Sequence, residues 1–161
     1  MELFINQCYM KIRISALDKL FSRYIRAQAG WTCTRCGRRY PEKSQGLHCA
    51  HIFSRAKKSV RYYPDNATAL CFPCHTWMDQ HTTENHAWWR ARIGEARWSM
   101  LLLTMAVPAK VDGAMVKRWL EQELGKLPVK RPSLQPVKSG SSDRARRSLC
   151  SGCWNNATTA I

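Results

Sequence analysis

Four segments of the chain have the apolar spacing of an amphipathic helix. In the first, residues 11–29, apolar side chains recur three and four positions apart, and Gly30 is expected to end the helix. Its apolar face consists of Ile14, Leu17, Leu20, Phe21, Tyr24 and Ile25. This period predicts a helix that packs one face against the rest of a domain.

Two further helical segments lie in the second half of the chain. Thr82 or Thr83 is expected to cap a helix that runs to Ile93. Gly94 then separates it from another helix over residues 95–106.

The fourth helical segment follows residue 111. Asp112 is expected to begin it as the cap, and Gly125 is expected to end it. Its buried face is predicted to contain Met115, Val116, Trp119, Leu120 and Leu124. Four other aromatic residues recur at helical intervals and are expected in the core: Trp77, Trp88, Trp89 and Trp98.

Between these segments, residues 31–65 are poor in long apolar runs. They are rich in Cys, Gly, Pro, Ser and basic side chains, and the apolar piece at 47–53 suits a small hairpin better than a helix. A bound metal could substitute for the core that this region lacks. Helices on either side of such a region predict an α+β domain.

The length of 161 residues allows one domain and an appendage. From Lys126 onward the composition changes to Pro, Ser, Lys and Arg, with seven basic residues and one acid, Asp143. Such a segment cannot bury enough apolar surface to fold. We therefore expect one domain over residues 1–127 and a disordered basic tail over 128–161.

A large excess of positive charge indicates a polyanionic partner. Lys and Arg number 26 against 11 acids, a formal net charge of +15, and nucleic acid would neutralise this self-repulsion. A membrane is not expected, because the longest apolar run, residues 100–107, is far shorter than the ~20 residues of a spanning helix. The first residues, MELFINQCYMKIR, do not resemble a signal peptide, so we expect a cytoplasmic protein.

In a reducing cytoplasm, regularly spaced cysteines predict metal ligation rather than disulfides. Cys33 and Cys36 form one Cys-x2-Cys pair, and Cys71 and Cys74 form a second. Four thiolates satisfy tetrahedral Zn²⁺ with no open position, so we predict a structural zinc. The alternative, a redox-active pair, lacks the βαβ pattern of thioredoxin-like proteins. Four more cysteines stay unassigned: Cys8, Cys49, Cys150 and Cys153.

A closed four-cysteine site leaves His51, Asn66 and His75 without a zinc to bind. The order AHI, PDN and LCFPCH, with WTCTRCG upstream, resembles the HNH endonuclease family and implies its ββα-metal fold. More widely, residues 17–103, including DKLFSRYIR, HIFSR and RYYPDNATALCFPCH, look like phage-encoded HNH proteins of the recombination or DNA-packaging neighbourhood.

The resemblance implies a role for each of the three residues. His51 would be the general base, because a neutral imidazole with a reference pKa of ~6.5 can take a proton from water. His75 would bind a divalent ion that offsets the charge developing on the phosphate. Asn66 would hold the loop that aims the base, although an Asn after Pro-Asp is also an ordinary turn residue.

One position departs from the family pattern. Many members carry an acid or a histidine directly before the base, where it binds the catalytic ion, and this chain has Ala50 there. Asp79, one helical turn after His75, is the first candidate for the missing ligand. Mg²⁺ or Mn²⁺ is expected as the catalytic ion, and a thiolate ligand would favour Zn²⁺ or Ni²⁺ instead. Weaker candidate ligands are His48, Cys49 and His81.

Basic side chains surround these candidates along the sequence, with no acid between them in either of two short stretches. They are expected to contact DNA phosphates rather than bases. These residues are Arg35, Arg38, Arg39, Arg55, Lys57, Lys58 and Arg61.

The sequence thus predicts a zinc-stapled ββα-metal centre flanked by helices, and the resemblance implies metal-dependent hydrolysis of DNA to 5′-phosphate and 3′-hydroxyl ends. The chief alternative is a non-catalytic zinc-binding protein that binds DNA or assists its packaging, which the alanine at position 50 favours. A thiol–disulfide redox protein is a third hypothesis, which zinc stoichiometry would test.

Overall fold

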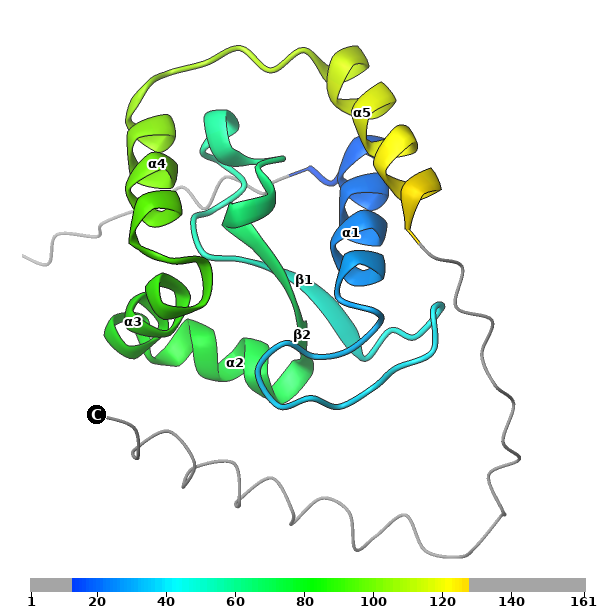
Figure 1. Ribbon diagram of the computed structural model, residues 1–161, viewed down its shortest axis with the longest axis vertical. Helices are drawn as coiled ribbons and strands as arrows, with labels where there is room; N and C mark the ends of the chain where they lie inside the picture. The colour runs from blue at the N-terminus through cyan, green and yellow to red at the C-terminus, as the bar shows by residue number, and fades with distance from the viewer. Residues whose placement is uncertain (1–12, 128–161) are drawn as a thin grey trace, which may run out of the picture.

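The computed structural model describes residues 13–127. These contain helices and one two-stranded sheet, so the fold is α+β, as the sequence predicts (Figure 1). The predicted basic tail lies outside the described residues, as do Cys8, Cys150 and Cys153. The elements are α1 (Ala16–Gln28), β1 (Leu47–His51), β2 (Ala67–Cys71), α2 (Phe72–Gln80), α3 (Thr82–Ile93), α4 (Glu95–Ala106) and α5 (Gly113–Lys126).

The helix α1 begins later than the apolar period predicts. Ser15 is its cap, in an extended conformation, and it forms a capping box with Asp18, so residues 13–15 are not helical. The expected start at residue 11 is therefore wrong. The apolar face is confirmed at Phe21, Tyr24 and Ile25, which are buried, but it is wrong at Ile14, which is exposed and precedes the helix.

The two strands pair antiparallel over their whole length. Leu47 pairs with Cys71 at one end of the sheet, and His51 pairs with Ala67 at the other. The expected small hairpin within residues 47–53 is therefore wrong in its extent, because the partner strand lies beyond a loop over 52–66. That loop contains two short 3-10 turns, Lys58–Val60 and Pro64–Asn66.

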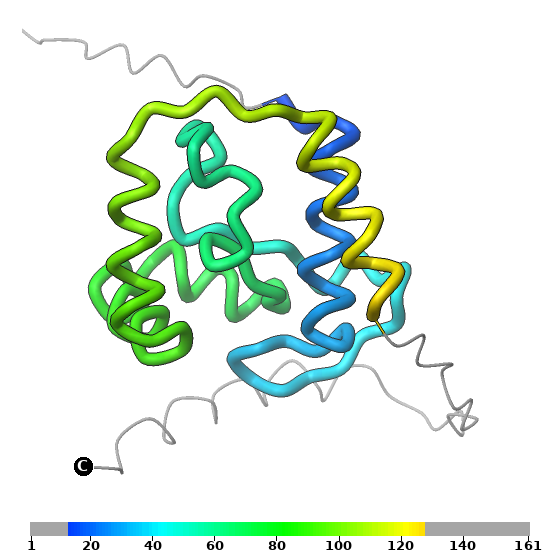
Figure 2. Tube along the Cα trace, turned by 45° about the horizontal axis from the view of Figure 1, so that its top comes forward, coloured from blue at the N-terminus to red at the C-terminus, as the bar shows by residue number. Residues whose placement is uncertain are grey.

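The sheet lies between two groups of helices. The helix α1 contacts both strands and is covered by α5, and Figure 2 shows α1 and α5 side by side. Tyr24 and Trp119 join these two helices with ring centroids 5.2 Å apart. The helix α2 contacts both strands, and the α3–α4 pair packs beside it and against the loop turns (Figure 1). Trp89 and Trp98 are buried in this second layer, as expected.

The later helices confirm some sequence signals and correct others. Asp112 caps α5, because its carboxylate accepts the N–H groups of residues 114 and 115. Gly94, with φ of 84°, separates α3 from α4 as predicted. The threonine cap is wrong, since α3 follows His81 and no side chain bonds at its start. Gly125 lies inside α5 rather than after it.

None of the helices described is long and apolar enough to cross a membrane.

Candidate metal centre and catalytic site

The four predicted zinc ligands converge on one point. The sulfur atoms of Cys33, Cys36, Cys71 and Cys74 all lie within 4.8 Å of one another, and the Cys36 and Cys71 sulfurs are 3.6 Å apart. Zn–S bonds of about 2.3 Å in a tetrahedron require sulfur atoms about 3.8 Å apart. The donor set and its spacing therefore fit a closed zinc site.

Backbone hydrogen bonds shape the first cysteine pair. The Cys33 N–H donates to the Arg38 carbonyl at 2.8 Å, and the Gly37 N–H donates to the Cys33 carbonyl at 2.9 Å. Gly37 has φ of 72°, which lets the chain close this turn at no steric cost. The Thr34 N–H then donates to the Ala69 carbonyl at 2.9 Å, which attaches the turn to the outer edge of β2.

The second cysteine pair spans the junction of β2 and α2. Cys71 is the last residue of the strand, and Cys74 lies in the first turn of the helix. The thiol of Cys74 hydrogen-bonds to Cys33, which lowers the pKa of Cys33 and raises that of Cys74. The guanidinium of Arg35 stacks on Trp77 beside this cluster, 3.7 Å from the ring centroid.

His51 ends β1 at the edge of the sheet remote from the cysteines. Its Nε2 lies 3.2 Å from the Arg61 carbonyl oxygen. Because a carbonyl can only accept, this contact is a hydrogen bond in the tautomer with the proton on Nε2 and the lone pair on Nδ1. The Cys49 carbonyl also interacts with the ring and favours its protonated form. Burial, with a smaller effect of the Arg55 charge, lowers the pKa of His51 to about 4. The imidazole is thus neutral at pH 7 and able to accept a proton.

A buried ion pair holds the carbonyl that His51 contacts. The Asp18 carboxylate accepts from Arg61 Nε at 2.8 Å and from Nη2 at 2.7 Å. The same Nη2 donates to the Arg13 carbonyl at 2.9 Å. The pair fixes the residue whose carbonyl orients the His51 ring, so it connects the start of α1 to the candidate base.

Asp18→Asn is expected to destabilise the protein by about 1–3 kcal/mol, because it leaves the partly buried Arg61 charge without its partner. Burial raises the pKa of Asp18, but the hydrogen bonds from Arg61 and Ser15 and the Arg61 charge outweigh it and hold the pKa well below its ordinary value of 3.8. Since the unfolded carboxyl titrates higher, this stability is complete above about pH 5 and is lost as the pH falls below about 4. Urea unfolding of both proteins at several pH values measures the difference.

The control for that measurement is Glu42→Gln. Glu42 pairs with Arg23 across an exposed surface, where the side chains are 55% and 60% accessible. Exposed pairs contribute about 0–1 kcal/mol, so this variant is expected to unfold close to the wild type. Equal destabilisation by both variants at pH 7 would contradict the role given to the buried pair.

Asn66 closes the loop over residues 52–66. Its side chain is fully buried, and Oδ1 accepts the Phe53 N–H at 2.9 Å. Nδ2 donates to the Phe53 carbonyl at 3.1 Å and to the Val60 carbonyl at 2.9 Å. The Asn66 backbone carbonyl also accepts from Ile52 at 3.0 Å. These bonds fix the loop that follows directly after His51.

His75 lies in α2 at the opposite end of β1 from His51. Its Nδ1 is 3.2 Å from Nδ1 of His48, and burial lowers the pKa of His75. Asp79 is exposed, and its negative charge opposes that pKa shift. Within residues 13–127, the cysteine cluster is the single group of three or more such ligands, so His75 and Asp79 do not gather a third.

The structure does not place His51 in contact with His75. His51 contacts Phe21 of α1, whereas His48 contacts Phe72 and His75 of α2, so the two histidines of β1 face different helices. Three residues along a strand span about 10 Å. His48 and His51 therefore start about 10 Å apart along β1 and leave opposite faces of the strand, so an ion at His75 and a proton acceptor at His51 lie beside different helices.

The charge of Arg55 acts on both His51 and His75. Its Nη2 donates to the Cys49 carbonyl at 3.4 Å. Its positive charge disfavours protonation of both His51 and His75. The Nε of Arg55 is buried and has no hydrogen-bond partner in the described part of the chain. A phosphate oxygen would satisfy this donor.

The other predicted DNA contacts fall into two groups. Arg35, Arg38 and Arg39 belong to the cysteine-bearing turn, and Lys57 and Lys58 are exposed on the loop at the other end of the sheet (Figure 1).

Cys49 is buried beneath α1, where burial raises the pKa of its thiol to about 12. His81 stacks on Trp77, with ring centroids 5.1 Å apart.

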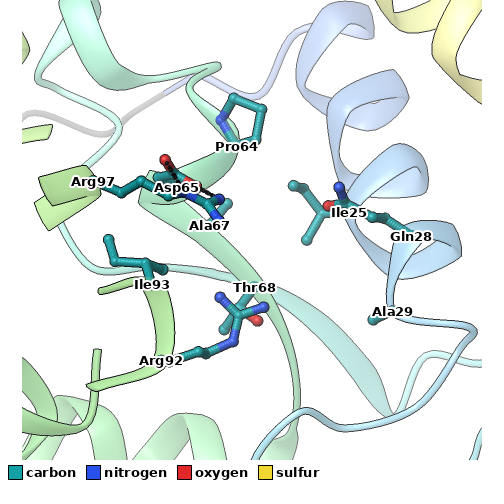
Figure 3. A pocket seen from close by; sticks show the side chains of 10 residues that line it. All are labelled: Ile25, Gln28, Ala29, Pro64, Asp65, Ala67, Thr68, Arg92, Ile93 and Arg97. Atoms are coloured by element: carbon teal, nitrogen blue, oxygen red, sulfur yellow. Dashed lines mark hydrogen bonds and ion pairs between the residues drawn. The ribbon is translucent and has the colours of Figure 1, made fainter. Parts of the chain in front are cut away.

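A cavity of about 360 Å³ has none of the cysteines or candidate histidines in its lining. It is bounded by parts of α1, β2, α3 and α4, and Figure 3 shows Arg97 paired with Asp65 in its wall. This ion pair neutralises one of the two arginines there. The other arginine of the lining, Arg92, is left as a positive charge in the cavity wall.

Two contributors to the site have weak signals in the sequence. Asp18 is visible there only as the fourth residue of a capping box, SALD, and nothing local indicates its bond to Arg61. His48 is one of several neighbours of the candidate base in the sequence. Only the pairing of the strands and the packing of α2 bring it to His75.

Comparison with known families agrees with this geometry. The family model described as HNH endonuclease matches residues 33–77, which run from the first zinc ligand to the early turns of α2. Searches among curated proteins and solved structures return no match. The matched residues include the whole cysteine cluster together with His51, Asn66 and His75. The match therefore supports assigning the part of the chain that carries this site to the HNH endonuclease family.

Proposed function

We propose that the protein is a divalent-metal-dependent endonuclease that hydrolyses DNA phosphodiester bonds. The observation that carries this proposal is the state of His51: a neutral ring whose Nε2 is fixed by a carbonyl and whose Nδ1 retains its lone pair. It lies within a segment that matches a nuclease family, beside a cation and at the end of a strand.

In the proposed reaction, Nδ1 of His51 takes a proton from a water molecule. The water oxygen then bonds to phosphorus, and the bond from phosphorus to the 3′ oxygen breaks. The leaving oxygen takes a proton from solvent, which gives 5′-phosphate and 3′-hydroxyl ends. A divalent ion at His75 would offset the negative charge on the phosphate and the leaving oxygen. Asn66 holds the loop behind the base, and Arg55 binds a phosphate oxygen.

The remaining basic residues would bind the DNA backbone. Lys57 and Lys58 are exposed on the loop, and the turn with Arg35, Arg38 and Arg39 extends the positive surface beyond the zinc cluster. Arg61 has a different part in this proposal, because its guanidinium is bound by Asp18 and the Arg13 carbonyl. We assign it to positioning the base. The proposal also places the protein in the cytoplasm, with phage recombination or DNA packaging as its setting.

One observation favours a second candidate, a zinc-stabilised DNA-binding or packaging accessory protein without catalysis. Position 50 carries no ligand, since Ala50 is fully buried in the core. A protein of this kind would keep the fold and the basic surface. It would bind DNA with or without added divalent ions.

Purified zinc-loaded protein is expected to cut plasmid DNA when a divalent ion is added, and to stop when that ion is withheld. Supercoiled, linear and branched DNA should each be incubated with Mg²⁺, Mn²⁺, Ni²⁺ and Zn²⁺, and the ends analysed by ligation. Binding without cleavage under all of these conditions would select the accessory-protein function instead.

A further inference from the structure

A pair of histidines outside the cysteine cluster has the spacing of two ligands on one ion. His48 lies on β1 and His75 on α2, and their Nδ1 atoms are 3.2 Å apart with the rings at 80°. Two nitrogens each about 2.1 Å from one ion, at bond angles between about 90° and 109°, lie about 3.0–3.4 Å apart. The observed separation falls inside this interval. It is also the length of a hydrogen bond from His75 Nδ1–H to His48 Nδ1, which a bound ion would replace.

The other nitrogen of His48 is already engaged. Its Nε2 lies 3.1 Å from the Gln45 carbonyl oxygen. A carbonyl accepts, so Nε2 carries the proton and the lone pair of Nδ1 is directed toward His75. A backbone carbonyl behind the ring is how metal-binding histidines are commonly oriented. His48 is therefore set in the tautomer that a ligand needs.

We propose that His48 and His75 together bind the divalent ion of the site, with His48 as the ligand that position 50 lacks. His48 and Ala50 are two residues apart on β1, so their side chains leave the same face of the strand. This inference rests on the proposed function for the use of the ion, but not for its binding.

The donor set also selects the ion. Two imidazoles favour first-row transition ions, whereas Mg²⁺ prefers oxygen ligands. The carboxylate nearest along α2, Asp79, is exposed and does not complete a three-ligand group with the pair. The site is therefore one for Mn²⁺, Ni²⁺ or Zn²⁺ rather than for Mg²⁺.

Calorimetric titration of the zinc-loaded full chain with Ni²⁺ tests this site. His48→Ala and His75→Ala are each expected to weaken Ni²⁺ binding by about 10-fold or more. His86→Ala is the matched control, because His86 is a partly buried histidine that contacts Phe53 and Trp98 instead. It should bind Ni²⁺ as the wild type does. Zinc content and circular dichroism are measured for every variant, so that displacement of zinc or loss of fold is visible.

A second variant keeps the test decisive if His48→Ala does not fold. His48→Asp retains a ligand but replaces nitrogen with oxygen, so Mg²⁺ affinity should rise relative to Ni²⁺ affinity. In the wild type, Mn²⁺ should broaden the ring resonances of His48 and His75 in NMR spectra and leave those of His86 sharp. Unchanged Ni²⁺ affinity in His48→Ala, or an unchanged metal preference in His48→Asp, overturns the inference.

A parallel cleavage assay separates this inference from the proposed function. If Ni²⁺ binding depends on both histidines but no DNA is cut, the metal site stands and the nuclease proposal fails. If DNA is cut and His48→Ala binds Ni²⁺ as tightly as the wild type, the nuclease proposal stands and His48 is not a ligand.

Discussion

Removal of zinc from the protein is expected to unfold the region around the four cysteines. Structural zinc sites contribute about 10–16 kcal/mol in small domains, which equals or exceeds the ~5–15 kcal/mol of a whole domain's stability. Here the ion would join the turn with Cys33 and Cys36 to the junction of β2 and α2. Circular dichroism and thermal melting, recorded while a strong chelator extracts the zinc, measure the effect.

Single substitutions give the same test without a chelator. Cys71→Ser should lower zinc content and melting temperature together, because it removes one of four ligands. Cys49→Ala is the matched control, since Cys49 is a buried cysteine on the neighbouring strand that takes no part in the cluster. It should retain zinc. A chelated protein that has lost its zinc yet keeps its spectrum and melting temperature would show that the cluster does not hold the fold together.

His51→Ala is expected to slow DNA cleavage by about 10²- to 10⁴-fold, which is the usual contribution of a general base. Zinc content and DNA affinity should stay close to those of the wild type, because His51 is neither one of the four cysteine ligands nor part of the exposed basic surface. Single-turnover cleavage at saturating DNA and divalent ion isolates the chemical step. If His51→Ala cuts as fast as the wild type, the residue is not the base and the accessory-protein function gains support.

The pH profile adds a readout that a purely structural histidine would not move. A base must be unprotonated, and the lowered pKa of His51, about 4, keeps it so. With the divalent ion saturating, the wild-type rate should therefore not decline near the reference pKa of ~6.5, but only closer to the lowered value.

Asn66→Ala should give a smaller rate loss than His51→Ala with a lower melting temperature, because it loosens the loop behind the base.

The features predictable from the sequence are those encoded by neighbouring residues. The two Cys-x2-Cys turns, the break at Gly94 and the cap at Asp112 each depend on a few consecutive positions, and the structure confirms them. The wrong predictions also have local causes. The threonine cap is wrong because α2 ends at Gln80, and the next residue, His81, both follows α2 and precedes α3.

Other parts of the site depend on contacts between distant residues. The strands β1 and β2 are separated in the sequence by the whole 52–66 loop, so no short sequence pattern predicts their pairing. The bond from Arg61 to Asp18 and the approach of His48 to His75 both follow from that pairing and from helix packing. Periodicity identifies which face of an element is buried, but not which polar side chains meet across it.

The packing of α1 against α5 constrains how the chain can acquire its structure during synthesis. Residues 33–77 leave the ribosome early and contain all four sulfur ligands, so they can capture zinc while translation continues. The apolar face of α1 is made earlier still, yet Trp119 and Leu120, which cover it, are made last among the described helices. The nascent chain therefore exposes the part of α1 that packs against α5 until α5 emerges, and that interval is when chaperones would engage it.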